Sequence, residues 1–254
     1  MSMPLVDPTD IDDVIYPESD DQPMAENFLQ SIVIRTLVGG FERIYAGRTD
    51  VIVGGDFFCY PVKGDPSIVV AADAMVIVQV PEPLDILAIG SYRQWEHGGH
   101  PALAVEVLSP RNSWAEMARK RRFYDQHGVD EYWVFDPRDG TLEVWVRDGE
   151  HLTEVPDPGG GWISPTTGVH VHVEGIELVV HDPDGRRRWL TPAQEGERGD
   201  AESARADAES ARADAESARA VAESARADAE SARAAELAAK VAELQARIAT
   251  DPAS

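Results

Sequence analysis

Two carboxylates in this 254-residue sequence stand in surroundings apolar enough to suggest metal chemistry. Asp73 is the one charged residue of the β-prone stretch 67–80, and Glu106 is the one charged residue of the apolar run 103–108. An ionised carboxylate in a buried strand is costly unless a cation or a metal pairs with it. If the two strands are neighbours, both carboxylates point to one side and share a divalent cation. Mg²⁺ or Mn²⁺ prefers such oxygen ligands, together with waters and a substrate phosphate.

A third group that could take part in this chemistry is a cation one helix away. Ser113 and Glu116 have the spacing of a capping box, so a helix is predicted to begin at about Trp114 and to end at Gly128. This helix carries four consecutive basic residues at 119–122, among them Lys120. A metal would activate water, and Lys120 would hold the scissile phosphate or position the nucleophile.

Simpler structural explanations exist for each of these residues. Asp73 could be an acid at a strand edge or a turn former, and Glu106 could form a structural ion pair with Lys120 or a buried arginine. A basic helix is more often a solvated surface than a phosphate site. The aromatic side chains nearby are interpreted as packing residues, namely Tyr124, Tyr132, Trp133 and Phe135.

The elements that must position these residues form a strand–helix–strand unit. The run 103–108 is apolar throughout except for Glu106, as expected of a strand that is buried on both faces. Residues 131–136, EYWVFD, predict a second strand after the helix. A helical crossover between two strands favours parallel pairing.

The remaining chain predicts further strands and one further helix around the same sheet. The helix is expected over residues 23–37, ending before the glycine pair 39–40. We expect strands at 41–45, on both sides of the glycine pair 54–55, at 67–80, in a hairpin that turns at 137–140, and at 169–180. Residues 81–99 are expected to form a loop that carries a short helical piece. The prediction is an α/β (α+β) domain built on one mixed sheet.

Charge and composition limit the classes of function. The formal net charge is −23; residues 1–194 hold 32 acidic and 15 basic residues, and residues 195–254 hold 14 and 8. Both parts repel polyanions at long range, which argues against non-specific wrapping of nucleic acid. A single cysteine, Cys59, excludes an intrachain disulfide. The N-terminus lacks the pattern of a signal peptide and no stretch is apolar enough for a membrane span, so we expect a cytoplasmic protein without membrane partners.

The C-terminal region is a heptad repeat. AESARAD recurs every seven residues from Ala201, which places alanine at both core positions of a coiled coil. Larger apolar residues follow with spacings of four, three and four, out of register with the alanine seam: Leu237, Val241, Leu244 and Ile248. The region 201–250 is therefore either a solvated single helix or a homo-oligomerising coiled coil, and we favour self-association.

Four segments together resemble one known family. VGGDFFCY at 53–60, VVAADAMVIV at 69–78, PALAVEVLSP at 101–110 and KRRFYDQHGVDEYWVFDP at 120–137 are similar to the Uma-type restriction endonuclease family of bacteria. This family is a branch of the PD-(D/E)XK nuclease superfamily. The resemblance implies a restriction-endonuclease-like core, Mg²⁺ or Mn²⁺ as cofactor and DNA as substrate. It places metal ligands at Asp73 and Glu106, with Asp56 as a further recurrent acid.

The sequence departs from the superfamily pattern at two positions. The proline usual before the metal aspartate is Ala72, and the lysine expected two residues after the glutamate is Leu108. In this branch the lysine appears on the following helix, where Lys120 stands. An acid of the first helix often supports the site, and Glu26 could serve.

The predicted organisation is an acidic arm at 1–22, a restriction-endonuclease-like domain at 23–193 and the heptad helix at 194–254. We expect a Mg²⁺-dependent endodeoxyribonuclease that uses Asp73, Glu106 and Lys120. The alternative is a catalytically silent nuclease fold that serves as a binding module on an oligomeric helix, which the acidic composition favours. The sequence names neither a DNA target nor an oligomer size.

Overall fold

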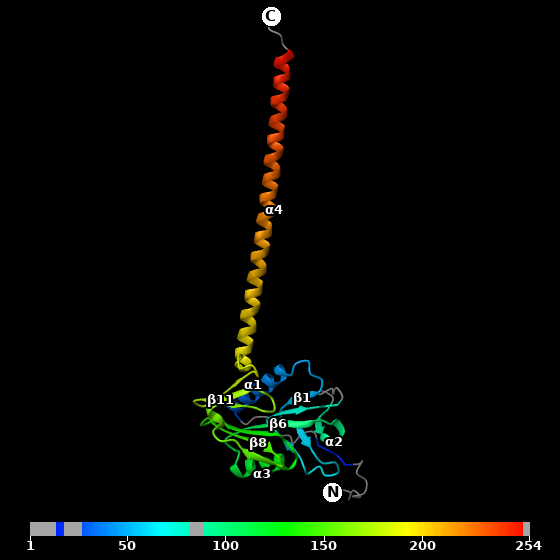
Figure 1. Ribbon diagram of the computed structural model, residues 1–254, viewed down its shortest axis with the longest axis vertical. Coiled ribbons are helices and arrows are strands. Elements are labelled where there is room, and N and C mark those ends of the chain that lie inside the picture. Colours follow the sequence, from blue (N-terminus) through cyan, green and yellow to red (C-terminus); the bar gives the residue numbers. More distant parts are fainter. Residues whose placement is uncertain (1–13, 18–26, 82–88, 251–254) are drawn as a thin grey trace. The chain divides into compact units, whose positions relative to one another are not determined.

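A six-stranded mixed sheet forms the centre of the first of two compact units, which divide between Glu195 and Gly196 (Figure 1). The computed structural model describes residues 14–17, 27–81 and 89–250. The strand order of the sheet is β1-β4-β6-β7-β8-β9, and two three-stranded sheets accompany it with the orders β10-β11-β12 and β3-β2-β5. The predicted α/β (α+β) class with a mixed sheet is confirmed, followed by a long C-terminal helix.

The described elements have the following bounds: α1 Phe28–Ile44, β1 Val51–Gly54, β2 Phe58–Tyr60, β3 Val70–Ala71, β4 Ala74–Val78, β5 Ser91–Arg93, α2 Gln94–His97, β6 His100–Val107, α3 Trp114–Gln126, β7 Glu131–Asp136, β8 Thr141–Asp148, β9 His151–Glu154, the 3₁₀ turn η2 Pro158–Gly160, β10 Trp162–Ile163, β11 His170–Glu174, β12 Glu177–His181 and α4 Pro192–Thr250. No described helix has a stretch long and apolar enough to cross a membrane.

The unit β6-α3-β7 has the predicted form. Strands β6 and β7 are parallel, and β4 pairs with the other edge of β6 in the antiparallel sense. β6 is buried on both faces, so its side chains divide between two cores. Leu103, Val105 and Val107 pack on the side of α1, whereas Ala104 and Leu108 pack on the side of α3. Glu106 therefore faces α3.

Helix α1 differs from the prediction at its C-terminal half. It runs through the glycine pair to Ile44, so the strand expected at 41–45 is wrong. Gly40 lies beneath Trp189, and a Cβ atom at Gly40 would stand 2.0 Å from the indole ring. Phe41 packs edge-on against the same ring, with centroids 4.9 Å apart. This packing outweighs the cost of about 1 kcal/mol for glycine within a helix.

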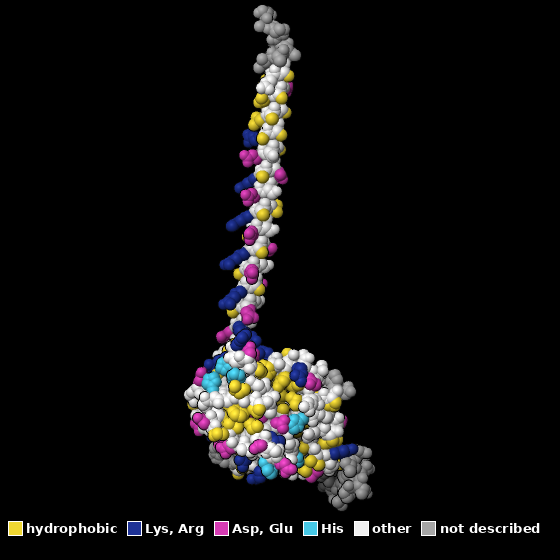
Figure 2. Space-filling view, viewed as in Figure 1, with side chains coloured by type: hydrophobic (Ala, Val, Ile, Leu, Met, Phe, Trp, Pro, Cys, Tyr) yellow, Lys and Arg dark blue, Asp and Glu magenta, His cyan; other side chains and the backbone are white. Residues whose placement is uncertain are grey.

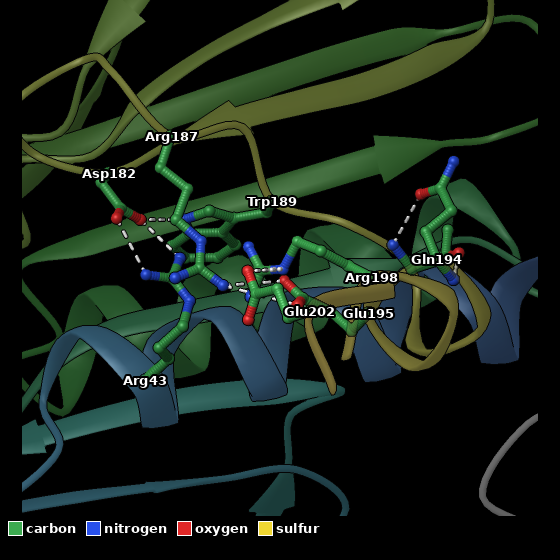
Figure 3. A network of polar contacts seen from close by, with 9 residues as sticks. Arg43, Asp182, Arg187, Trp189, Gln194, Glu195, Arg198 and Glu202 are labelled. Carbon is green, nitrogen blue, oxygen red and sulfur yellow. Dashed lines mark hydrogen bonds and ion pairs between the residues drawn. The ribbon is translucent and has the colours of Figure 1, made fainter. Parts of the chain in front are cut away.

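Polar contacts reinforce the packing of Trp189 against α1 (Figure 3). The guanidinium of Arg43 donates to Asp182 at 2.8 Å, and the indole N–H of Trp189 donates to the same carboxylate at 2.7 Å. Hydrogen bonding from Arg43 lowers the pKa of Asp182 despite partial burial. Asp182 thus joins the segment after β12 to the C-terminal half of α1.

The stretch 67–80, predicted as one strand, is two strands in different sheets. β3 pairs with β2 in a small sheet, and β4 pairs with β1 and β6 in the central sheet. The chain changes sheet at Ala72 and Asp73, so Asp73 precedes β4 instead of lying within a strand. β5 lies in the region predicted as a loop at 81–99, of which residues 82–88 are outside the described part.

The close contact at Gly40 leads to a prediction about stability. Gly40→Ala should lower the free energy of unfolding by about 1–3 kcal/mol, because the methyl group would overlap the Trp189 ring. Chemical denaturation of the purified chain measures this change. Gly39→Ala is the matched control: a Cβ there meets nothing within 4 Å, so this variant should be neutral or more stable. Equal effects at both positions would contradict the packing argument.

Candidate active site

Glu106 lies in the middle of the apolar strand β6 and is only 3% exposed. Two side chains of α3 donate to its carboxylate. Lys120 Nζ lies 2.7 Å from Oε2, and the Tyr124 hydroxyl lies 2.7 Å from Oε1. Lys120 and Tyr124 are four residues apart and therefore share one face of the helix. The helix thus satisfies both oxygens of a carboxylate that would otherwise be buried without partners.

Asp73 approaches the same strand from the side of β4. The antiparallel pairing of Ala74 with Val105 puts Asp73 beside the end of β6. The backbone N–H of Val107 donates to Asp73 Oδ2 at 2.6 Å. The sequence hypothesis placed Asp73 and Glu106 within neighbouring strands; β4 and β6 are neighbours, and Asp73 lies one residue before β4.

A glycine permits the backbone approach that holds Asp73 in place. A Cβ atom at Gly55 would stand 2.2 Å from the carbonyl oxygen of Asp73. Asp56, the next residue, has a left-handed backbone with φ of 57° and donates its N–H to the carbonyl of Ala72 at 2.8 Å. The turn after β1 therefore lies against the backbone of Ala72 and Asp73.

Lys120 connects the buried carboxylate to an open cleft. Its ammonium donates to the carbonyl of Ala71 at 3.1 Å as well as to Glu106, and its side chain is 24% exposed. The cleft has a volume of about 540 Å³. It is lined by Phe58, Val69, Val70, Ala71, Glu116, Arg119, Lys120 and Phe123. A ligand in this cleft would reach Lys120.

The carboxylates of the site repel one another in a poorly solvated environment. Burial raises the pKa of Asp73 to about 7, and the charges of Glu106 and Asp56 act in the same direction. Burial also raises the pKa of Glu106, against the influence of Lys120 and Tyr124. For Lys120, burial acts to lower the pKa, but the nearby carboxylates raise it overall, which keeps the ammonium charged.

This arrangement fits a hard divalent cation. Asp73 and Glu106 supply carboxylate oxygens, and one ammonium does not balance the charges of two acids held beside each other. A second positive charge would offset the repulsion between the two acids and favour the ionised form of Asp73, whose pKa is raised mainly by burial. Within residues 14–17, 27–81 and 89–250, no three His, Cys, Asp or Glu side chains form a cluster able to hold a metal by themselves. A cation here would complete its shell with water, backbone oxygen or substrate, as Mg²⁺ commonly does.

Two polar contacts of the site were missed from the sequence. Tyr124 packs in the core as expected, and its hydroxyl also donates a hydrogen bond to the Glu106 carboxylate. Its spacing of four from Lys120 could have indicated this. Gln30, on α1, is buried and donates to the carbonyl of Val107 at 2.8 Å. No sequence signal marks this glutamine, and Glu26, the acid expected from the first helix, lies outside the described residues.

The role of Tyr124 leads to a second prediction. Tyr124→Phe should lower the free energy of unfolding by about 1–3 kcal/mol, because it leaves one oxygen of a buried carboxylate without a donor. Thermal and chemical denaturation measure the change. Tyr132→Phe is the matched control, since the Tyr132 ring lies 4.8 Å from that of Tyr124 and its buried hydroxyl has no hydrogen-bond partner among the described residues. A larger loss for Tyr132→Phe would contradict this assignment.

Comparison with known proteins identifies a family and a similar solved structure. The model of the Uma2 family, described as "Putative restriction endonuclease", matches residues 22–178, more than half of the chain. A solved structure described as a "putative nuclease belonging to DUF820", from Anabaena variabilis, aligns with a TM-score of 0.42 and 16% identity. The alignment covers 59% of this chain and 79% of that chain. No curated protein matches the sequence.

Proposed function

The chain belongs to the Uma2 family of restriction-endonuclease-like proteins, and from this premise we propose that it is a metal-dependent endonuclease that hydrolyses DNA phosphodiester bonds. One observation carries the proposal beyond the family name. Asp73, directly before β4, and Glu106, on β6, lie beside each other, and Lys120 donates to Glu106 and lines an open cleft. Two neighbouring carboxylates and an ammonium that reaches a cleft are groups suited to metal-assisted phosphodiester hydrolysis.

In this proposal Asp73 and Glu106 hold Mg²⁺ or Mn²⁺, and Asp56 is a further acid that supports the site. A bound divalent cation would polarise a phosphoryl oxygen and lower the pKa of a water molecule. Lys120 would contact a non-bridging phosphate oxygen from its position at the cleft. Tyr124 and the Val107 amide hold the two carboxylates in place, which limits the reorganisation needed on substrate binding.

The local charge of the cleft supports a phosphate substrate in an otherwise acidic chain. Arg119 and Lys120 line the cleft, and only Glu116 opposes them among its lining residues. The net charge of −23 disfavours indiscriminate adsorption to DNA, so attraction is restricted to this basic patch. We further propose a nuclease domain at 23–193, homo-oligomerisation through residues 201–250 and activity in the cytoplasm, where DNA is accessible.

Removal of one carboxyl charge tests the proposed metal site. Asp73→Asn keeps the shape of the side chain and an acceptor for the Val107 amide, so the fold should persist. Binding of Mn²⁺, measured by calorimetry, should weaken at least about tenfold, and plasmid cleavage should fall by about 100-fold or more.

Asp148→Asn provides the control, because it removes the same charge from an exposed position at the end of β8. It should bind Mn²⁺ and cleave plasmid like the wild type. A wild-type chain that neither binds Mn²⁺ nor cleaves DNA would reject the nuclease and favour the catalytically silent binding module.

The raised pKa of Asp73 predicts a pH dependence of metal binding. Protons and metal compete for the ionised carboxylate, so the apparent affinity for Mn²⁺ should rise about tenfold per pH unit below the Asp73 pKa of about 7 and level off above it. In Asp73→Asn this rise of the Mn²⁺ affinity with pH, below about pH 7, should disappear. An affinity of the wild type that is constant across pH 7 would refute this assignment of the ligand.

The raised pKa of Asp73 also predicts that the stability of the metal-free protein falls with rising pH. Because the folded state binds the Asp73 proton more tightly than the unfolded state, the free energy of unfolding should fall as pH rises from 3.8 to about 7. Denaturation of wild type and Asp73→Asn across this interval, in a chelator, separates the contribution of Asp73 from that of other acids.

A further inference from the structure

The second unit of the chain exposes an apolar stripe that has no partner within the described protein. From residue 201 to residue 246 every side chain of α4 is exposed. Leu237, Val241 and Leu244 are 59%, 53% and 57% exposed and follow each other with spacings of four and three. This spacing puts them on one side of the helix. Large apolar side chains gathered on one face of an isolated helix are a surface for a partner helix.

The heptad repeat also leaves a row of charges without partners. Arginine recurs after each second core alanine, in the position named e, at Arg205, Arg212, Arg219, Arg226 and Arg233. Aspartate occupies the position named g in three of the repeats, at Asp207, Asp214 and Asp228. Figure 2 shows the basic side chains in a file along one side of the helix. Among the described residues, α4 forms ion pairs through Glu195, Arg198 and Lys240, and none is formed by the five repeat arginines.

We infer that α4 pairs with α4 of a second copy in the parallel orientation and in register. In a parallel pair, position g of one helix faces position e of the next heptad in the other helix. Asp207, Asp214 and Asp228 then face Arg212, Arg219 and Arg233 of the second copy, and the twofold axis repeats each contact. In an antiparallel pair e faces e and g faces g, so arginine would meet arginine and aspartate would meet aspartate.

The apolar stripe lies on another side of the helix from the alanine seam. Counted in the AESARAD heptad, Leu237 and Leu244 share the position of Glu202, and Val241 shares that of Ala213, both outside the two core positions. The seam must therefore change register after the last repeat for the stripe to reach the second copy, and a parallel, in-register pair makes this change at the same level in both helices. The alanines permit a close approach, and the charges at positions e and g decide the direction.

Parallel pairing has a consequence that rests on the proposed function. Each α4 is joined at its N-terminal end to its own nuclease-family unit, so the pair holds two such units at one end. Two metal sites in one particle match the two strands of duplex DNA. The pairing itself does not depend on catalysis, and its test below needs no nuclease activity.

Charge reversal in the full-length chain tests the pairing. Reversal at position e by Arg212→Glu, Arg219→Glu and Arg233→Glu together should weaken the dimer at least about tenfold in sedimentation equilibrium, because acids then face acids. Reversal at position g by Asp207→Arg, Asp214→Arg and Asp228→Arg should weaken it similarly. The combined variant should recover the wild-type affinity.

The outer face provides the control. Glu202→Arg, Glu209→Arg and Glu223→Arg change the net charge in the same sense as the g variant but lie away from the seam, so the dimer should persist. A wild-type chain that stays monomeric, or a dimer unaffected by reversal at e or g, overturns the inference. Mn²⁺ binding per chain, measured on the same samples, reports separately on the nuclease proposal.

Cysteine cross-linking distinguishes the orientation directly. Ala211→Cys at a core position should form a disulfide with its own equivalent under mild oxidation, because only a parallel, in-register pair brings these positions together. Ala213→Cys, two residues away on the outer face, should remain uncross-linked. The natural Cys59 is buried and serves as background in the wild-type chain. Equal cross-linking of both variants, or none in a proven dimer, would overturn the parallel arrangement.

Discussion

A buried carboxylate in the central strand constrains much of the first unit. Glu106 lies between apolar neighbours on β6, where an unpaired charge would cost several kcal/mol. The fold meets this requirement with a helix that brings an ammonium and a hydroxyl to the two oxygens. The parallel crossover from β6 to β7 sets α3 over the face to which Glu106 points. The same packing of α3 on the sheet therefore both buries the apolar core and supplies the hydrogen-bond donors to Glu106.

The second carboxylate is held by backbone groups, in contrast to the first. The carboxylate of Asp73 accepts a hydrogen bond from the backbone N–H of Val107. The carbonyl of Val107 in turn accepts a hydrogen bond from the side chain of Gln30 on α1. Gly55 lies against the Asp73 carbonyl where no side chain fits. The position of the Asp73 carboxylate thus depends on β6, on α1 and on the turn after β1. Its negative charge has fewer side-chain donors beside it than that of Glu106. This asymmetry gives the site one acid that is paired by two side chains in the metal-free protein and one acid whose charge state responds to pH and to cations.

What the sequence revealed about this site depended on whether each signal was local. The strand 131–136 and the N-cap Ser113 were predicted correctly, because β propensity and capping are read from adjacent residues. The predicted end of helix α1 came too early because Trp189, whose ring leaves room only for glycine at position 40, lies far along the chain. The break at Ala72 and Asp73 was missed because both flanking segments are equally β-prone. Gln30 has no periodic signal at all, and its role exists only after the fold has formed.

The acidic composition and the proposed DNA substrate become compatible if attraction is confined to the cleft. A chain with net charge −23 has little long-range affinity for a polyanion, so each site must depend on short-range contacts from Arg119, Lys120 and a bound cation. Such contacts are weak when they act singly. Two sites joined by α4 would engage the same duplex, because binding of the first raises the effective concentration of the second. Under the proposed function, pairing of the heptad helix would raise the affinity for DNA through bivalency and so offset the repulsion caused by the negative charge of the chain.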